Sequence, residues 1–114
     1  MKTNKQILKN EGENMKMMTK EIINKIPKLY ETDGQPEDKK IAYVKFFCPW
    51  NHWTWYAFEF DGKDTFFGFV KGHDSELGYF SLSELKSITG PFGLKIERDM
   101  YSSPLTLTEI REVA

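Results

Sequence analysis

Cys48 and His52 are the first residues in this 114-residue chain whose types and spacing suggest chemistry, because they lie four positions apart. An imidazole can activate a thiol as a nucleophile when a third group orients the imidazole. The sequence offers no such third group, and a cysteine at the end of an apolar run is usually a small buried hydrophobe. We therefore expect Cys48 in the core and predict a protein that is not an enzyme.

Acidic residues gather in two polar turns. Asp61 and Asp64 enclose a Gly-Lys turn, and Asp74 and Glu76 follow His73. Carboxylates and an imidazole can bind a divalent cation, but this spacing matches neither the Ca²⁺ loop nor a His-rich zinc motif. Consecutive hairpin turns also lie at opposite ends of the strand that they share. We predict no metal site, and no cofactor, because the glycines spell neither a phosphate loop nor the dinucleotide fingerprint.

A run of aromatic residues between positions 50 and 69 is the most distinctive feature of the chain. Strand alternation places Trp53 and Trp55 on one face and the rings of positions 56, 58 and 60 on the other. Since a small domain cannot easily bury both rows, we expect one row to form an exposed partner surface. The alternative is that most rings are core. The predicted partner-binding residues are Trp50, Trp53, Trp55, Asp61, Asp64, Asp74 and Glu76.

Periodicity, turn residues and capping residues predict the elements that position these side chains. Strands are expected at about 41–48, 53–60, 65–71, 77–81 and 94–99. Thr19, Ser81 and Thr106 are predicted N-caps of short helices at about 19–26, at 82–88 and after 106. We predict an α+β fold with a mainly antiparallel sheet of about five strands and short helices packed on one face. Residues 1–17 are predicted to be a flexible extension, and 18–114 a single domain.

Composition narrows the classes of partner. Cys48 is the single cysteine, so no intramolecular disulfide can form, and no apolar run approaches the roughly 20 residues of a membrane span. We expect a cytoplasmic protein without membrane contact. Residues 31–114 hold nine basic and 14 acidic side chains, a net charge of −5, whereas residues 1–30 carry +4. Because nucleic-acid affinity depends on cationic groups that replace counterions, nucleic acid is a disfavoured partner.

Several strings of residues in this chain are also found, in the same order, in a known family. They include Trp53-Thr54-Trp55-Tyr56, Glu59-Phe60-Asp61-Gly62, Asp64-Thr65-Phe66-Phe67-Gly68 and Gly78-Tyr79-Phe80-Ser81. Over about residues 18–110 the chain resembles the domain of unknown function family numbered twenty-nine fifty-eight. The resemblance implies a small bacterial protein carried by plasmids and phages near antirestriction and conjugation genes. It implies no established reaction and assigns no catalytic residue.

Two functions of different classes remain open. The first is a non-enzymatic protein of mobile-element origin that modulates or inhibits a host defence nuclease, of a CRISPR or restriction system, by contacting the nuclease or its guide complex. The second is an accessory protein that binds single-stranded nucleic acid by stacking bases on Trp53 and Trp55. The acidic body favours the first, because acidic groups complement a basic cleft and repel phosphate. The basic segment before Tyr30 supports the second.

Overall fold

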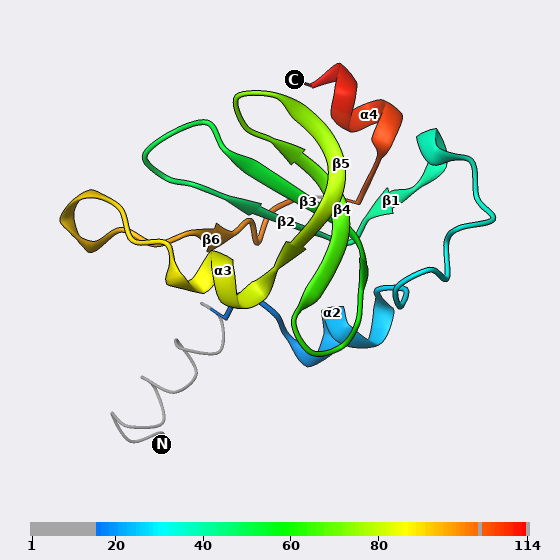
Figure 1. Cartoon of the computed structure of the whole chain (residues 1–114), viewed down its shortest axis with the longest axis horizontal. Coiled ribbons are helices and arrows are strands. Elements are labelled where there is room, and N and C mark those ends of the chain that lie inside the picture. The colour runs from blue at the N-terminus through cyan, green and yellow to red at the C-terminus, as the bar shows by residue number, and fades with distance from the viewer. Residues whose placement is uncertain (1–15, 103, 114) are drawn as a thin grey trace.

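The computed structural model describes residues 16–102 and 104–113. Within them, a five-stranded antiparallel sheet has the order β5-β4-β3-β2-β6 (Figure 1). Its strands are β2 (Val44–Phe47), β3 (Thr54–Phe60), β4 (Thr65–Lys71), β5 (Ser75–Ser81) and β6 (Glu97–Arg98). A second sheet pairs β1 (Ile41–Ala42) with β7 (Leu105–Thr106). The α+β fold with an antiparallel sheet is confirmed.

Three short helices each begin directly after a residue that the sequence predicted as an N-cap. They are α2 (Lys20–Lys25), α3 (Leu82–Ser87) and α4 (Leu107–Glu112). The hydroxyls of Thr19, Ser81 and Thr106 each accept a hydrogen bond from a backbone N–H of the first turn, at 3.0–3.2 Å. Two 3-10 helices, η1 (Glu37–Lys39) and η2 (Pro91–Gly93), lie in loops. No helix in the described part of the chain is long and apolar enough to cross a membrane.

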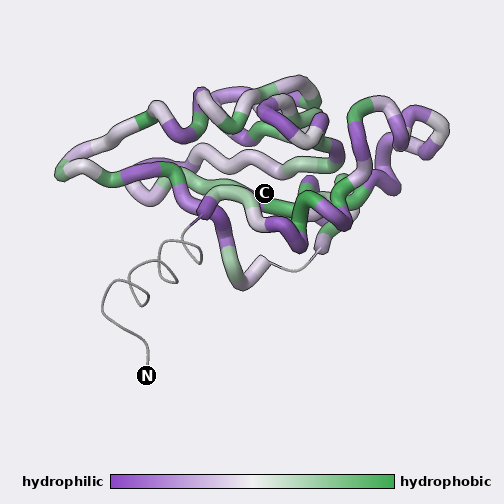
Figure 2. The backbone as a smooth tube through the Cα atoms, turned by 90° about the horizontal axis from the view of Figure 1, so that it is seen from below, coloured by the Kyte–Doolittle hydropathy of each residue, from purple (hydrophilic) through white to green (hydrophobic). Residues whose placement is uncertain are grey.

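Helices cover both faces of the sheet, which corrects the prediction that they pack on one face. Ile26, the C-cap of α2, and Leu82 and Leu85 of α3 are buried in one core with β2, β3 and β4. α4 buries Leu107 and Ile110 in a second core. The pairing of β1 with β7 holds the chain beside the second face before α4 begins. In Figure 2 the hydrophobic stretches lie mainly in the middle of the molecule and hydrophilic stretches mainly in the outer loops.

Both aromatic rows of β3 are buried, so the expected exposed row is absent from this strand. Trp55 is 8% exposed in the first core, and Tyr56 and Phe58 lie in the second. The register with β4 shifts between Ala57 and Glu59, a β-bulge that adds one residue to β3. After the bulge the alternation is reversed, so Phe60 returns to the first core. Two covered faces can bury two rows, which a sheet covered on one face could not.

The predicted extension 1–17 falls mostly outside the described residues. Of its last two residues, Lys16 is exposed and Met17 is buried in the first core beside Met18. The packed domain therefore includes at least one residue that the sequence assigned to the extension.

Candidate functional site

Three loops meet at one end of the sheet, on the left side of Figure 1. We call residues 48–53, 72–76 and 89–95 the loop end. The Trp53 ring lies against Gly72, where a Cβ atom would be 2.4 Å from the ring, and the Trp50 ring lies against Gly90, where a Cβ would be 2.5 Å away. Because Gly72 and Gly90 have no side chain, the rings of Trp53 and Trp50 can pack against them. These two contacts connect the three loops.

Trp53 is half-buried, and two neighbouring rings pack against its indole. Its ring centroid lies 5.9 Å from that of Trp55 and 5.7 Å from that of His73, the latter in an edge-to-face arrangement of 86°. The Trp53 backbone N–H donates to Asn51 Oδ1 at 2.9 Å, which closes the 48–53 loop. The loop end therefore presents a rigid aromatic group whose inner ring, Trp55, belongs to the core.

Phe92 lies in the third loop and is fully exposed. Its φ angle is 58°, in the left-handed region, which is rare for a bulky residue. The loop is closed by Gly90 N–H donating to Leu94 O at 2.7 Å and by a bridge between Thr89 and Lys95. Sequence reasoning missed Phe92, although an aromatic residue inside the turn Gly90-Pro91-Phe92-Gly93 is the signal that could have identified it.

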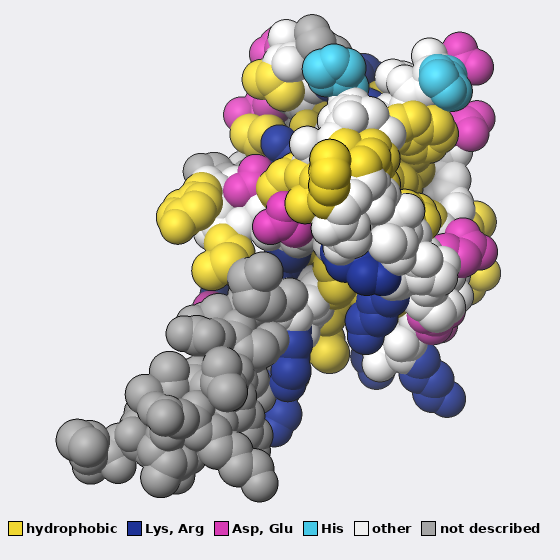
Figure 3. Space-filling model, turned by 90° about the vertical axis from the view of Figure 1, so that its left-hand side faces the viewer, with side chains coloured by type: hydrophobic (Ala, Val, Ile, Leu, Met, Phe, Trp, Pro, Cys, Tyr) yellow, Lys and Arg dark blue, Asp and Glu magenta, His cyan; other side chains and the backbone are white. Residues whose placement is uncertain are grey.

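Two of the four predicted acidic residues belong to the loop end. Asp74 and Glu76 are exposed, and their side chains make no hydrogen bond or ion pair within the described residues. Figure 3 faces this side of the molecule and shows hydrophobic side chains gathered across its middle, with acidic side chains on both sides of them and Lys and Arg side chains below them. Both carboxylates are therefore available to groups outside the chain.

The other two acidic residues lie at the opposite end of β4, which we call the turn end (residues 59–64). Asp61 Oδ1 accepts backbone N–H groups of residues 63, 64 and 65 at 2.8–3.0 Å. Burial raises the pKa of Asp61, but these donors outweigh it and the net pKa is lowered. Asp64 accepts from the backbone N–H and the hydroxyl of Ser83, at 2.8 and 2.9 Å, in the first turn of α3. Of the predicted partner-binding set, the structure thus brings together Trp50, Trp53, Asp74 and Glu76, buries Trp55, and separates Asp61 and Asp64.

Glu59 is a buried carboxylate at the turn end that the sequence did not single out. It is 2% exposed. It accepts the backbone N–H groups of Tyr30, at 2.8 Å, and Thr32, at 3.2 Å, together with the Thr32 hydroxyl. Lys40, also buried, donates to the Thr32 carbonyl and hydroxyl oxygens at 2.7 Å. This network fixes the segment 30–40 to β3.

The remaining candidates for chemistry, the Cys48–His52 pair and the potential metal ligands, do not form a site within the described residues. Cys48 is 3% exposed in the first core, as predicted, while His52 is exposed in the loop. Within residues 16–102 and 104–113, no group of three or more His, Cys, Asp or Glu side chains could hold a metal ion.

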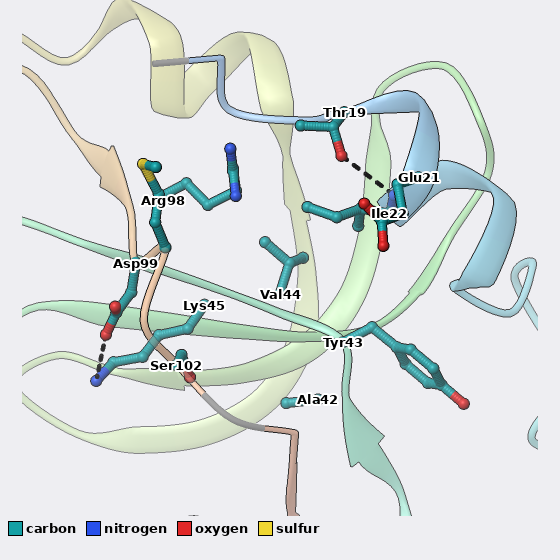
Figure 4. A pocket seen from close by; sticks show the side chains of 11 residues that line it. Thr19, Glu21, Ile22, Ala42, Tyr43, Val44, Lys45, Arg98, Asp99 and Ser102 are labelled. Atoms are coloured by element: carbon teal, nitrogen blue, oxygen red, sulfur yellow. Dashed lines mark hydrogen bonds and ion pairs between the residues drawn. The ribbon is translucent and has the colours of Figure 1, made fainter. Parts of the chain in front are cut away.

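A cleft of about 400 Å³ lies between the start of α2, the residues around Val44 and the segment after β6 (Figure 4). Its charged side chains are engaged with their neighbours. Lys45 Nζ lies 3.5 Å from Asp99 Oδ2, and Arg98 Nε donates to the Lys16 carbonyl at 3.0 Å. The cleft is therefore polar and of mixed charge, and its cations are already neutralised or hydrogen-bonded.

One protein family matches this chain. Its sequence model, described as protein of unknown function (DUF2958), matches residues 8–114. The match extends beyond the range of about 18–110 expected from the resemblance, so the family pattern begins within the predicted extension. Neither a curated protein nor a solved structure matches the chain.

Proposed function

This chain belongs to the DUF2958 family of proteins of unknown function, and we propose that it is a non-enzymatic binding protein whose loop end contacts a partner protein. The observation that carries the proposal is Phe92. A fully exposed aromatic side chain held at positive φ costs stability, and among residues 16–102 and 104–113 no contact of this side chain offsets the cost. A contact outside the chain is the function that such a side chain serves.

The surroundings of Phe92 fit a binding surface. Trp50 lies against the base of its loop at Gly90, and Trp53 lies in the neighbouring loop. Aromatic anchors on rigid supports carry most of the binding energy in protein interfaces, because they bury a large area and lose little entropy. A rigid loop end with these three rings therefore supports tight contact with an apolar pocket.

The acidic residues indicate the charge of the partner. Asp74 and Glu76 have no partner within the described residues, and they lie beside the aromatic group. Acidic groups around an apolar centre complement a basic protein surface. We propose, as the finer assignment, a host defence nuclease, whose nucleic-acid channel is a basic surface of this kind.

The alternative, stacking of single-stranded nucleic acid, has less support. It requires Trp53 and Trp55 side by side as a base platform, and Trp55 is buried in the first core. Trp53 is engaged by Gly72 and His73. Phosphates approaching this end would also meet Asp74 and Glu76, which repel them.

The test is a comparison of three variants of the full chain with the wild type in affinity capture from the native host. Phe92→Ala removes the exposed ring, and the double variant Asp74→Lys with Glu76→Lys reverses the acidic charge. Val113→Ala is the matched control, because Val113 is an exposed apolar residue at the C-cap of α4, outside the loop end. We expect one protein to be captured with the wild type and the control, and its affinity to fall at least about tenfold with Phe92→Ala.

Retention of that protein by both loop-end variants would contradict the proposal. Capture of nucleic acid in a salt-dependent manner, with no protein, would support the alternative instead. The nuclease assignment has its own test, in which the purified chain is added to cleavage assays of the host's restriction and CRISPR nucleases. Inhibition by the wild type and not by Phe92→Ala is expected, and no inhibition of any of them would rule out this finer assignment.

A further inference from the structure

The strand β5 is an open edge of the five-stranded sheet. It pairs with β4 along its whole length, from Ser75 to Ser81, and no strand in the described residues pairs with its other side. Ser75, Glu76 and Tyr79 are exposed, and Leu77 is half-buried. At seven residues, it is as long as the central strands β3 and β4. An edge of this length is a template for pairing with another chain.

The hydrogen-bond pattern identifies the groups that face outward. The Gly72 N–H donates to the Asp74 carbonyl, and residue 71 pairs with residue 75. In an antiparallel ladder this makes 71 and 75 a non-hydrogen-bonded pair, so the even-numbered residues of β5 exchange hydrogen bonds with β4. The N–H and C=O groups of Ser75, Leu77 and Tyr79 therefore point away from the sheet.

This strand carries one exposed charge, Glu76, but several other features that block an edge are missing from it. It has no Lys and no Pro, and its register with β4 runs without a bulge from Thr65 opposite Ser81 to Lys71 opposite Ser75. Gly78, in the middle of β5, lies opposite Gly68 of β4. A Cβ at Gly68 would lie 1.9 Å from the Tyr56 carbonyl oxygen, so packing requires that glycine. A Cβ at Gly78 would meet nothing within 4 Å, which leaves open space over the face of the sheet at this residue.

We propose that β5 pairs antiparallel with β5 of a second copy of this chain, about a two-fold axis at Leu77. This register uses the three outward-facing residues that precede the start of α3. It sets Leu77 against Leu77 of the second copy and Ser75 against Tyr79 of the second copy. The two glutamates do not face each other, because Glu76 lies opposite Gly78 of the second copy, in the open space. In this register the two Leu77 side chains meet at the axis, and no glutamate lies directly opposite another glutamate.

The dimer joins two five-stranded sheets into one continuous sheet. The net charge of −1 per chain leaves little repulsion between the copies. One strand pair buries less surface than a permanent interface, so the dimer is weak and depends on concentration. The dimer surface shares Glu76 with the loop end, whereas Phe92 and the two loop-end tryptophans lie outside β5. The two proposals are therefore tested by different variants, Leu77→Lys for the dimer and Phe92→Ala for the partner contact.

The test is sedimentation velocity of the full chain from about 1 μM to about 1 mM, a range that covers weak association. The wild type is expected to change from monomer to dimer with rising concentration. Leu77→Lys and Leu77→Glu are each expected to remain monomeric, because like charges meet across the axis. An equimolar mixture of the two variants is expected to recover the dimer, because opposite charges then meet. Val113→Lys, at the C-cap of α4, is the control and keeps the dimer.

A second variant covers the case in which a charge at residue 77 disturbs the second core. Ser75→Pro removes one outward N–H at the first residue of an edge strand, where proline is tolerated. It is expected to weaken the dimer at least about tenfold. A wild type that is monomeric at every concentration overturns the proposal. A dimer that survives Leu77→Lys, or a mixture that fails to recover it while both variants are folded by circular dichroism, overturns it equally.

Discussion

The two ends of β4 carry acidic residues of the same type in similar hairpin turns, yet they use them in opposite ways. At the turn end the carboxylates of Asp61, Asp64 and Glu59 accept eight hydrogen bonds from groups of their own chain. At the loop end the carboxylates of Asp74 and Glu76 accept none within the described residues. The difference shows that composition alone does not identify a binding surface. A carboxylate is available to a partner when its own chain leaves it unused.

The largest expected effect is at the buried carboxylate of the turn end. Glu59→Ala leaves the buried N–H of Thr32 and the part-buried N–H of Tyr30 without acceptors, so the free energy of unfolding should fall by about 3 kcal/mol. Urea unfolding monitored by tryptophan fluorescence measures this loss. Glu59→Gln keeps one acceptor oxygen and should lose less. A loss below about 1 kcal/mol for the alanine variant would mean that the network does not hold the segment 30–40.

A smaller loss is expected from the carboxylate that supports α3. Asp64→Ala removes the acceptor of the Ser83 N–H and hydroxyl, which should cost about 1–2 kcal/mol. Asp74→Ala is the matched control, because Asp74 lies in the turn at the other end of β4. This substitution should change the free energy of unfolding by less than about 0.5 kcal/mol. If thermal unfolding shows equal losses of stability for the two variants, the proposed difference between the two ends of β4 is wrong.

The loop end should gain stability when its strain is removed. Phe92→Gly relieves a positive φ, and after the entropy cost of glycine the net gain should be about 0.5 kcal/mol. Phe92→Ala keeps the strained backbone and should show no gain. The two variants can be compared by differential scanning calorimetry. A glycine variant no more stable than the alanine variant would remove the evidence for strain at this residue.

The smallest effect concerns acid pH. The pKa of Asp61 is lowered in the folded protein, so its contribution to stability is present above its unfolded pKa, near 3.8. That contribution is lost as the pH falls through the lower, folded pKa. Asp61→Asn should therefore lower stability at pH 6 and narrow its difference from the wild type below about pH 4. A constant difference between pH 6 and pH 2.5 would contradict the assignment. The effect is small because the side chain is exposed.

Local signals in the sequence predicted most elements of the fold but not their packing. Caps, turns and alternation are properties of a few neighbouring residues, so the starts of α2, α3 and α4 could be placed. The bulge in β3 could not, because one extra residue leaves the local pattern unchanged and only the pairing with β4 reveals it. The second core escaped prediction because α4 reaches it through a pairing of residues about 65 positions apart, such as Ile41 with Thr106.

The same distinction applies to the candidate site. The separation of the two acidic turns followed from the hairpin order, which sequence reasoning recognised. The use of each carboxylate did not, because Asp64 binds a residue 19 positions away and Glu59 binds residues 27 and 29 positions away. Such contacts form through the tertiary fold. Phe92 was missed for the opposite reason, since a residue that touches nothing leaves no trace in a pattern read for packing.

The burial of Cys48 has a consequence for kinetics. It is the single thiol of the chain, it lies in the first core, and its backbone N–H is bonded to the Trp53 carbonyl at 3.0 Å. A thiol reagent can reach it when β2 separates from the rest of the core. Its rate of alkylation in the native protein therefore measures how often this core opens, and needs no introduced label.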